Sequence, residues 1–184
     1  KIYALDTRTG SKKWEYEHGG SIYAPFAIDE DGTVYVPLYS MMSLVALDGK
    51  TGRKKWGYGL NKPISSPTIG PEGTIYIGDK ENAKVHALDS KTGTQKWVFN
   101  TGKSQNGWVY TYPAIGDDGT IYIGSLNGKY YALDGKTGRE KWVFELPPVT
   151  RGTPGPSSAV IGANGTLYFG SSDGIFYAIA TGSK

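Results

Sequence analysis

The sequence ALDTRTGSKKW, residues 4–14, decides how the chain is organised, because it returns three more times. The later copies are ALDGKTGRKKW at 46–56, ALDSKTGTQKW at 87–97 and ALDGKTGREKW at 132–142. All four keep the alanine, aspartate, threonine-glycine and tryptophan positions at the same spacing. A period this regular indicates one supersecondary unit used several times along the chain.

Each copy predicts two short antiparallel strands joined by a tight turn. In the leading strand, for example residues 85–88, successive side chains differ in character, as expected for a strand with two different faces. The aspartate that follows can accept hydrogen bonds from backbone N–H groups, and the glycine four residues later suits a backbone with positive φ. The tryptophan lies on the departing strand, where a large ring can bury roughly 150–250 Å². We therefore predict that these rings dock neighbouring units together: Trp14, Trp56, Trp97 and Trp142.

A second motif, glycine-threonine-aliphatic-tyrosine, accompanies every unit at 32–35, 73–76, 119–122 and 165–168. A short segment that ends in isoleucine precedes it, at 24–28, 66–69, 112–115 and 158–161. The pattern predicts four strands per unit, in positions A to D, for example 64–69, 74–78, 84–88 and 95–99. A repeated four-stranded antiparallel sheet is the blade of a β-propeller. We predict a single all-β segment over 1–184, with repeats at 1–42, 43–83, 84–128 and 129–174 and a partial one at 175–184.

The composition agrees with an all-β protein. The 184 residues are 38% hydrophobic and 13% aromatic, and 27 glycines and 10 prolines separate short β-branched and aromatic runs. The absence of cysteine excludes disulfides, thiol catalysis and thiolate metal sites. No apolar run reaches the roughly 18 residues of a membrane-spanning helix, and no signal peptide is recognisable. Because the sequence begins at Lys1 inside a predicted strand, we expect a processed product or a piece of a longer protein.

The two motifs together resemble the tryptophan-docking blades of PQQ-like propellers. This family includes quinoprotein alcohol dehydrogenases, a propeller lipoprotein of outer-membrane barrel assembly, and sensor domains of some bacterial kinases. The resemblance covers essentially the whole chain. It implies a ring of seven or eight blades and a bacterial envelope location, periplasmic or extracellular. Because these proteins share blades rather than sites, it does not by itself assign an activity.

The number of predicted strands leads to a hypothesis about the ring. Strands C and D open the chain, three full blades follow, and strands A, B and C close it, which makes 17 strands, or four blades plus one. We expect the chain to be the C-terminal half of a longer propeller, cut inside a blade. Alternatively, two copies pair into one ring.

Acidic turns at 29–32 and 117–119 are the candidates for a metal site, since clustered carboxylates suit calcium. The equivalent turns at 71–73 and 163–165 lack these charges, so ordinary turn chemistry is the favoured interpretation. His18 and His86 have no partner at metal-ligand spacing, and His86 is predicted to be a packed strand residue. We predict no metal site.

No local motif predicts catalysis. The sequence has no nucleophile elbow and no phosphate-binding loop. The resemblance implies that a dehydrogenase would need a calcium carboxylate set, a catalytic aspartate and usually adjacent cysteines, and the cysteines are absent. We predict no catalytic residue and no cofactor. PQQ and calcium belong to an alternative, in which the chain is a fragment of a PQQ-dependent dehydrogenase.

The basic residues gather in the C-to-D hairpins. A solvated sheet edge is the favoured interpretation, and attraction to an acidic polymer or lipid surface is the alternative. The hairpins lack interleaved aromatic residues apart from the docking tryptophans, so no nucleic-acid partner is predicted. Twelve of the 20 basic residues lie there: Arg8, Lys12, Lys13, Lys50, Arg53, Lys54, Lys55, Lys91, Lys96, Lys136, Arg139 and Lys141.

The D-to-A loops at 100–112 and 145–157 break the period, and loops on a rigid scaffold commonly carry binding sites. Trp108 is the one tryptophan outside the docking positions. An aromatic cluster around it can stack on a peptide, a sugar or a quinone, or Trp108 can simply plug the channel mouth. Met41 and Met42 are expected on the same face. The predicted binding residues are Trp108, Tyr110, Tyr112, Tyr23 and Arg151.

These features together predict a non-catalytic binding or assembly scaffold. Its partner is a protein or a small molecule, contacted through the D-to-A loops. The remaining blades of a ring, or a second copy, are further partners under the two ring hypotheses. The alternatives are the dehydrogenase fragment and an extracellular ligand-sensing domain.

Overall fold

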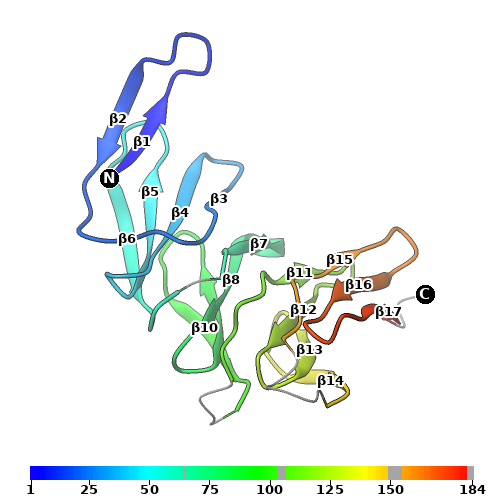
Figure 1. Ribbon diagram of the computed structural model, residues 1–184. Helices are drawn as coiled ribbons and strands as arrows, with labels where there is room; N and C mark the ends of the chain where they lie inside the picture. Colours follow the sequence, from blue (N-terminus) through cyan, green and yellow to red (C-terminus); the bar gives the residue numbers. More distant parts are fainter. Residues whose placement is uncertain (64, 103–106, 149–154, 182–184) are drawn as a thin grey trace.

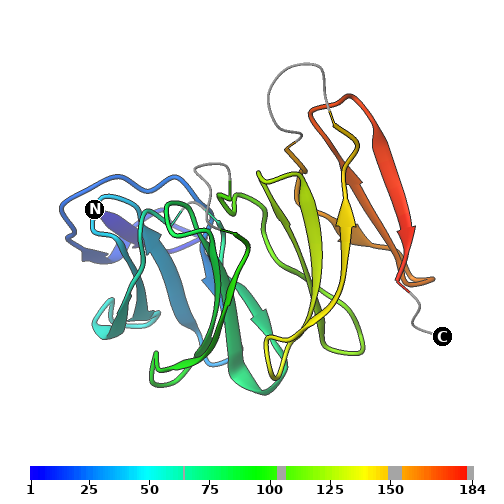
Figure 2. The ribbon, with the colours of Figure 1, turned by 90° about the horizontal axis from the view of Figure 1, so that it is seen from below.

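The computed structural model describes residues 1–63, 65–102, 107–148 and 155–181. It contains seventeen strands in five sheets, and every strand pairs antiparallel with its neighbour in sequence. The sheets follow one another around an arc, with the first strand of each four-stranded sheet on the inner side (Figure 1). Seen from below, they stand side by side from the N-terminal hairpin to β15–β17 (Figure 2). The predicted all-β propeller of four-stranded blades is confirmed.

Three sheets are complete blades, and two lack strands. The first sheet pairs β1 (Ile2–Leu5) with β2 (Lys12–Tyr16), which occupy positions C and D. The complete blades are β3 (Ala27–Ile28), β4 (Thr33–Leu38), β5 (Ser43–Asp48) and β6 (Lys54–Gly59); β7 (Thr68–Gly70), β8 (Thr74–Asp79), β9 (Lys84–Asp89) and β10 (Gln95–Asn100); and β11 (Ala114–Ile115), β12 (Thr120–Ser125), β13 (Lys129–Asp134) and β14 (Glu140–Glu145). The last sheet holds β15 (Val160–Ile161), β16 (Thr166–Gly170) and β17 (Phe176–Ala180) in positions A, B and C.

The strands in position A are shorter than the sequence predicts. We expected strands over 24–28 and 64–69, and the structure has two residues in β3 and three in β7. Pro25, Pro67 and Pro113 precede β3, β7 and β11, and a proline cannot donate to a sheet ladder. Side chains connect this inner region between blades: Thr68 Oγ1 donates to the Pro113 carbonyl at 2.8 Å.

The core lies between successive sheets. All six residues of β4, β8 and β12 are buried, so these strands are covered on both faces. At the junction between the second and third complete blades, Val85 and Ala87 of β9 pack with Ile121 of β12 and Leu133 of β13. The one helical segment in the described ranges is a 3-10 turn, Pro71–Gly73. Among the same residues, no helix has the length and apolarity that crossing a membrane requires.

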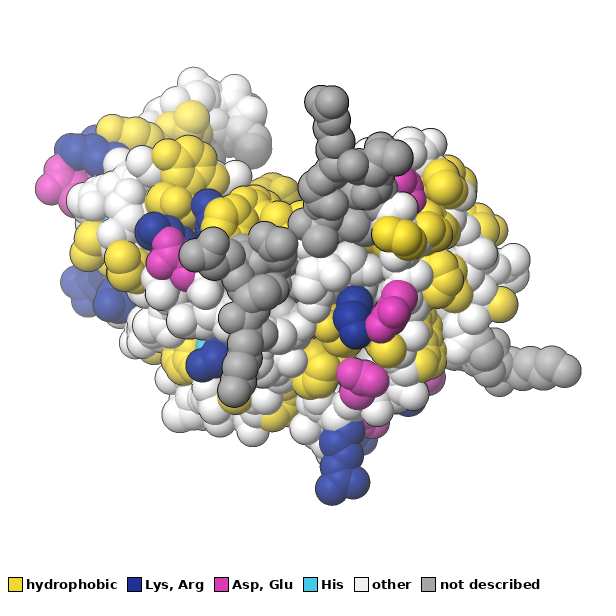
Figure 3. Space-filling view, turned by 60° about the horizontal axis from the view of Figure 1, so that its bottom comes forward, with side chains coloured by type: hydrophobic (Ala, Val, Ile, Leu, Met, Phe, Trp, Pro, Cys, Tyr) yellow, Lys and Arg dark blue, Asp and Glu magenta, His cyan; other side chains and the backbone are white. Residues whose placement is uncertain are grey.

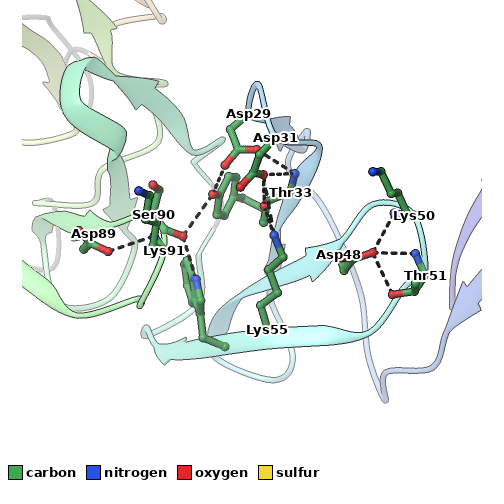
Figure 4. A network of polar contacts seen from close by, with 12 residues as sticks. Asp29, Asp31, Thr33, Asp48, Lys50, Thr51, Lys55, Asp89, Ser90 and Lys91 are labelled. Carbon is green, nitrogen blue, oxygen red and sulfur yellow. Dashed lines mark hydrogen bonds and ion pairs between the residues drawn. The ribbon is translucent and has the colours of Figure 1, made fainter.

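The C-to-D hairpins close through their aspartates (Figure 4). Asp48 Oδ1 accepts hydrogen bonds from the backbone N–H groups of Lys50 at 3.0 Å and Thr51 at 2.8 Å. The Thr51 hydroxyl donates to the same oxygen at 2.9 Å, and together with the backbone bonds it lowers the Asp48 pKa. Gly52, with φ of 73°, then returns its N–H to the Asp48 carbonyl. The same arrangement recurs at Asp6, Asp89 and Asp134.

Three of the repeat tryptophans reach the following hairpin. Their Nε1 atoms donate to the carbonyl one residue after its aspartate: Trp14 to Gly49 at 2.8 Å, Trp56 to Ser90 at 2.9 Å and Trp97 to Gly135 at 2.8 Å. Each ring also covers the turn glycine, where an added Cβ would lie within 2.7 Å of it: Gly52, Gly93 and Gly138. These junctions therefore combine apolar packing with one directed hydrogen bond.

Trp142 has a different environment. Its ring lies 5.7 Å from Tyr122 of its own blade and packs, partly buried, against the cluster that contains Leu167 and Phe169. At the position of Asp134 the last sheet has Ala180, which cannot form the aspartate turn. Among the described residues, Trp142 Nε1 has no hydrogen-bond acceptor.

The basic hairpins lie beside the A-to-B turns of their own blades. Lys141 Nζ donates to Thr120 Oγ1 at 2.5 Å and lies 3.0 Å from Asp118 Oδ2. The Thr120 hydroxyl bond, followed by the Lys141 bond, lowers the Asp118 pKa to about 2. Figure 3 shows basic and acidic side chains next to each other on one face of the molecule. Elsewhere in the same blade, Lys129 Nζ lies 2.7 Å from Glu145 Oε1. Five of the twelve basic residues of the hairpins form ion pairs with carboxylates among the described residues.

Candidate functional site

An open hollow lies where the D-to-A segments meet the B-to-C turns, on the face opposite the hairpins. Its volume is about 390 Å³, and its lining comes from two blades and their connections. Trp108 borders it through its contacts with two of the lining residues. The lining residues are Tyr23, Tyr39, Lys80 and Tyr110. We refer to these four residues and Trp108 as the aromatic–lysine site.

Local packing fixes the position of Trp108 and Tyr110. Val109 between them is fully buried against Gly78, where an added Cβ would lie 2.4 Å from Val109 Cγ1. Only glycine at 78 leaves space for this inward side chain. Because neighbouring residues in extended backbone point to opposite sides, Trp108 and Tyr110 face outward. The Trp108 carbonyl accepts a hydrogen bond from Leu126 N–H at 2.9 Å, which attaches the segment to the next blade.

Lys80 supplies the charge of the site. Its Nζ lies 4.3 Å from the Trp108 ring centroid and 5.8 Å from that of Tyr110, within the range of cation–π attraction. The two rings are 5.8 Å apart. No carboxylate of the described residues forms an ion pair with Lys80, whereas the nearby Lys62 pairs with Glu81. The ammonium therefore remains available to an anionic group.

Tyr39 and Tyr23 form the other side of the hollow. Their rings meet edge to face at 4.8 Å, a favourable aromatic geometry. Tyr39 and Lys80 occupy the same place in successive blades, the first residue after β4 and after β8. Tyr23 is 67% exposed, so most of its surface faces solvent in spite of this contact.

The structure brings together three of the five residues that the sequence suggested: Tyr23, Trp108 and Tyr110. Tyr112 lies outside the hollow, and its backbone N–H already donates to Ser158 Oγ at 2.8 Å. Arg151 lies outside the described residues. Met41 and Met42 are about half exposed on the neighbouring turn.

Sequence reasoning missed Lys80 and Tyr39. The place six residues after the threonine of strand B holds Tyr39, Lys80, Leu126 and Ser172 in the four repeats, so it follows no pattern. That variability in an otherwise regular repeat was the available signal.

A second polar group lies between the first two complete blades. His86 is 6% exposed, and its Nε2 lies 3.7 Å from Oδ2 of the buried Asp79. Its Nδ1 lies 3.3 Å from the Tyr58 hydroxyl, which donates to Gln95 at 2.6 Å. Burial opposes ionisation of Asp79, but the nearby His86 ring and the hydrogen bonds from the Asn61 and Asn82 backbone N–H groups outweigh it and lower the Asp79 pKa.

This polar group is a variant of a repeated contact between blades. Tyr58 and His86 meet at 5.6 Å, edge to face, where the next two junctions have Phe99 with Tyr131 at 5.3 Å and Phe144 with Tyr177 at 5.6 Å. His86 is thus a packed strand residue that replaces a tyrosine of the repeat. We assign it a structural role.

The described residues do not fit calcium-bound PQQ. Among them, no three histidine or acidic side chains converge as metal ligands. Asp29 and Asp31, the most acidic turn, accept bonds from Thr33 N–H, and Asp29 also accepts one from the Tyr35 hydroxyl (Figure 4). The aromatic–lysine site carries an ammonium, which would repel a divalent cation. No chemical step is therefore assigned to that cofactor.

Solved structures with this arrangement of sheets include BamB from Moraxella catarrhalis, with a TM-score of 0.73 and 23% identity over 93% of this chain and 50% of that one. The quinohemoprotein alcohol dehydrogenase of Comamonas testosteroni has a TM-score of 0.74 and 18% identity over 97% and 38% of the two chains. The computationally designed Ika8 protein has a TM-score of 0.77 and 16% identity over 97% and 52%. The chain thus spans about half of these structures or less.

The comparison with curated protein sequences gives no match. The family model described as outer membrane protein assembly factor BamB matches residues 1–184, the entire chain. The chain therefore belongs to this family of PQQ-like repeat propellers.

Proposed function

We propose that the chain is a non-catalytic binding scaffold, which holds a polypeptide partner at the aromatic–lysine site. The observation that carries the proposal is the Lys80 ammonium over Trp108, beside the exposed ring of Tyr23. Aromatic rings supply contact area at a small cost in conformational entropy, and a cation near them selects for a carboxylate. The matching ligand is an extended peptide segment with aromatic and acidic side chains.

The family membership supports a protein partner and a place in the bacterial envelope. The matching family is described as an outer membrane protein assembly factor, and assembly requires contact with other polypeptides. Under the same proposal, neither PQQ nor calcium is needed. The dehydrogenase alternative rests on a likeness of fold to the Comamonas testosteroni enzyme.

Calorimetric titration tests the proposal with two synthetic peptides of about eight residues, one alternating phenylalanine with aspartate and one alternating phenylalanine with asparagine. We expect the acidic peptide to bind at least about 10-fold more tightly, because a charged hydrogen bond adds roughly 1.4 kcal/mol or more. Lys80→Met keeps the apolar stem, so it should remove this difference while leaving weak binding of both peptides. Lys50→Met, on an outer turn of the opposite face, is the matched control and should bind like the unaltered chain.

Two results would overturn the proposal. One is equal affinity of the Lys80→Met variant and the unaltered chain for the acidic peptide. The other is oxidation of an alcohol with a dye as electron acceptor, after addition of PQQ and calcium, since turnover would establish the dehydrogenase alternative.

A further inference from the structure

A pocket of about 440 Å³ lies between the first two complete blades. Its walls come from the end of β6, from the β8–β9 turn and from β9 and β10. Apolar side chains border it as well as polar ones, since Met42 and Val98 in its lining are 49% and 43% exposed. We call it the inter-blade pocket, and its lining includes Met42, Leu60, Asp79, Lys84, His86 and Val98.

The next junction shows which group fills the equivalent place. Tyr131 occupies the position of His86 in the following blade and is 5% exposed. Its hydroxyl donates to the Thr101 carbonyl at 2.9 Å and accepts a bond from Asn127 Nδ2 at 2.8 Å. A phenol therefore spans that junction, and its hydroxyl is paired at both ends.

His86 changes this arrangement because an imidazole is shorter than a phenol. Its Nε2 is buried and has no hydrogen-bond partner among the described residues. The 3.7 Å to Asp79 Oδ2 is too long for a hydrogen bond, and that oxygen already accepts one from the Asn61 N–H at 2.9 Å. Because buried polar groups are normally paired, the unpaired nitrogen in the lining of a pocket indicates a place for a ligand group.

The hydrogen bonds of Tyr58 determine what kind of group this is. The Tyr58 hydroxyl donates to Gln95 Oε1 at 2.6 Å, so it can only accept from His86 Nδ1, which lies 3.3 Å away. A neutral imidazole that donates from Nδ1 leaves Nε2 as an acceptor. The matching ligand group is therefore a donor, such as a hydroxyl.

Lys84 adds a donor to the same pocket. The equivalent Lys129 pairs with Glu145 at 2.7 Å, but the residue opposite Lys84 on β10 is Asn100, which carries no charge. Within the part of the chain that the structure describes, Lys84 forms no ion pair. Its ammonium can therefore donate to the oxygen of a ligand hydroxyl.

We propose that the inter-blade pocket binds the phenol of a tyrosine side chain from a polypeptide partner. The phenol hydroxyl donates to His86 Nε2, and the ring packs against Met42 and Val98. The ligand thus supplies at this junction the group that Tyr131 supplies at the next one. The polypeptide source rests on the proposed function, because both sites use the β8–β9 turn: Lys80 lines the aromatic–lysine site and Asp79 lines the pocket.

Proton NMR of the imidazole rings tests the pocket in the unaltered chain, since His86 lines it and His18, the other histidine, does not. The probe is 4-fluorophenol. We expect it to shift the His86 signals with a dissociation constant on the order of 1 mM, as suits a ligand of about eight non-hydrogen atoms, and to leave His18 unmoved. Fluorobenzene lacks the hydroxyl and should bind about fivefold or more weakly. Unmoved His86 signals, or equal shifts of both histidines, would overturn the proposal.

His86→Tyr tests the same pocket by filling it from within. The variant carries the residue of the repeat, so it should fold, and urea denaturation verifies this. Its affinity for 4-fluorophenol, measured from the fluorine signal of the ligand, should fall about tenfold or more. Both chains carry Trp108→Ala in this comparison, so that stacking at the aromatic–lysine site does not contribute. An unchanged affinity would contradict the proposal.

A short glycine peptide with tyrosine at its centre tests the polypeptide source. It should shift the His86 signals at least as strongly as 4-fluorophenol does, and the same peptide with phenylalanine should bind about fivefold or more weakly. A tyrosine peptide that leaves His86 unmoved would overturn the assignment to a polypeptide. Lys80→Met should not alter these shifts, and His86→Tyr should not alter the affinity for the phenylalanine–aspartate peptide, so this proposal and the proposed function can fail separately.

Discussion

Four hairpins on one face of the array are near copies of one another, whereas the segments on the opposite face share few side chains from blade to blade. On the hairpin face, Asp48 and its equivalents repeat the same bonds to backbone and threonine, and three tryptophans repeat the same contact with the next turn. On the other face, the first residue after strand B is Tyr39 in one blade and Lys80 in the next, so an aromatic side chain is replaced by a cation. Repetition thus marks residues that build the fold, and variation marks residues free to bind.

The largest effect that would test this comparison is expected at Trp97. It is 8% exposed and donates to Gly135, so Trp97→Ala removes a buried ring and leaves a cavity between two blades. We expect a loss of about 3–5 kcal/mol in the free energy of unfolding, measured by urea denaturation. A loss below about 1 kcal/mol would show that the tryptophans do not hold the blades together.

A comparison of Trp97→Phe with Trp142→Phe sharpens the argument. Both changes remove an indole N–H, but only Trp97 has an acceptor, the Gly135 carbonyl. Trp97→Phe should cost about 1 kcal/mol more than Trp142→Phe, because it removes a buried hydrogen bond, and the Gly135 carbonyl then keeps only the bond from the Tyr76 hydroxyl at 3.0 Å. Equal costs, measured in parallel urea titrations, would contradict this difference between the junctions.

The hairpin aspartates should make the fold sensitive to acid. Hydrogen bonds from Thr92 N–H, its hydroxyl and Lys91 N–H lower the Asp89 pKa, although burial opposes them. A carboxylate with a lowered pKa stabilises the fold above its unfolded value of about 3.9, and this contribution disappears as the pH falls through the folded value. We therefore expect Tm to be nearly constant from about pH 7 to 5 and to fall below about pH 4.

The control for this prediction is Asp89→Asn, which cannot ionise. It should be less stable than the unaltered chain at neutral pH by about 1 kcal/mol, and its Tm should fall less steeply in acid. Identical acid slopes for the two proteins would assign the acid sensitivity to other carboxylates.

The smallest effect on stability is expected on the opposite face. Trp108 is partly exposed, and its fixed neighbour Val109 carries the buried contact with Gly78. Trp108→Ala should therefore change the free energy of unfolding by about 0.5 kcal/mol or less, while Val109→Ala should cost about 1–2 kcal/mol. A large destabilisation by Trp108→Ala would mean that this ring is a structural plug, the alternative interpretation of the aromatic cluster.

Most of the fold could be predicted from the sequence because its determinants are local and repeated. The aspartate, glycine and tryptophan of residues 46–56 lie within one hairpin, and each strand follows a turn signal. The length of the inner strands could not be predicted as well, since Pro67 and its equivalents limit pairing at positions where the apolar pattern continues.

The candidate site was less predictable, because it combines positions that are distant in sequence. Trp108 and Tyr110 were found through the break in the period, but Lys80 lies in a short turn without a motif. Its approach to Trp108 depends on the packing of Val109 against Gly78 and on the curvature of the array. Neither this packing nor this curvature can be predicted from the sequence of a single repeat.

The span of the aspartate turn has a consequence for how such a chain assembles. The bond from Thr92 to Asp89 connects residues three apart, so a hairpin can form before any other part of the protein is in place. Each unit then needs only its immediate neighbour to become stable, and folding can begin at any of four equivalent positions. Addition or loss of whole units by gene duplication or deletion would therefore change the length of the array without requiring a new folding nucleus.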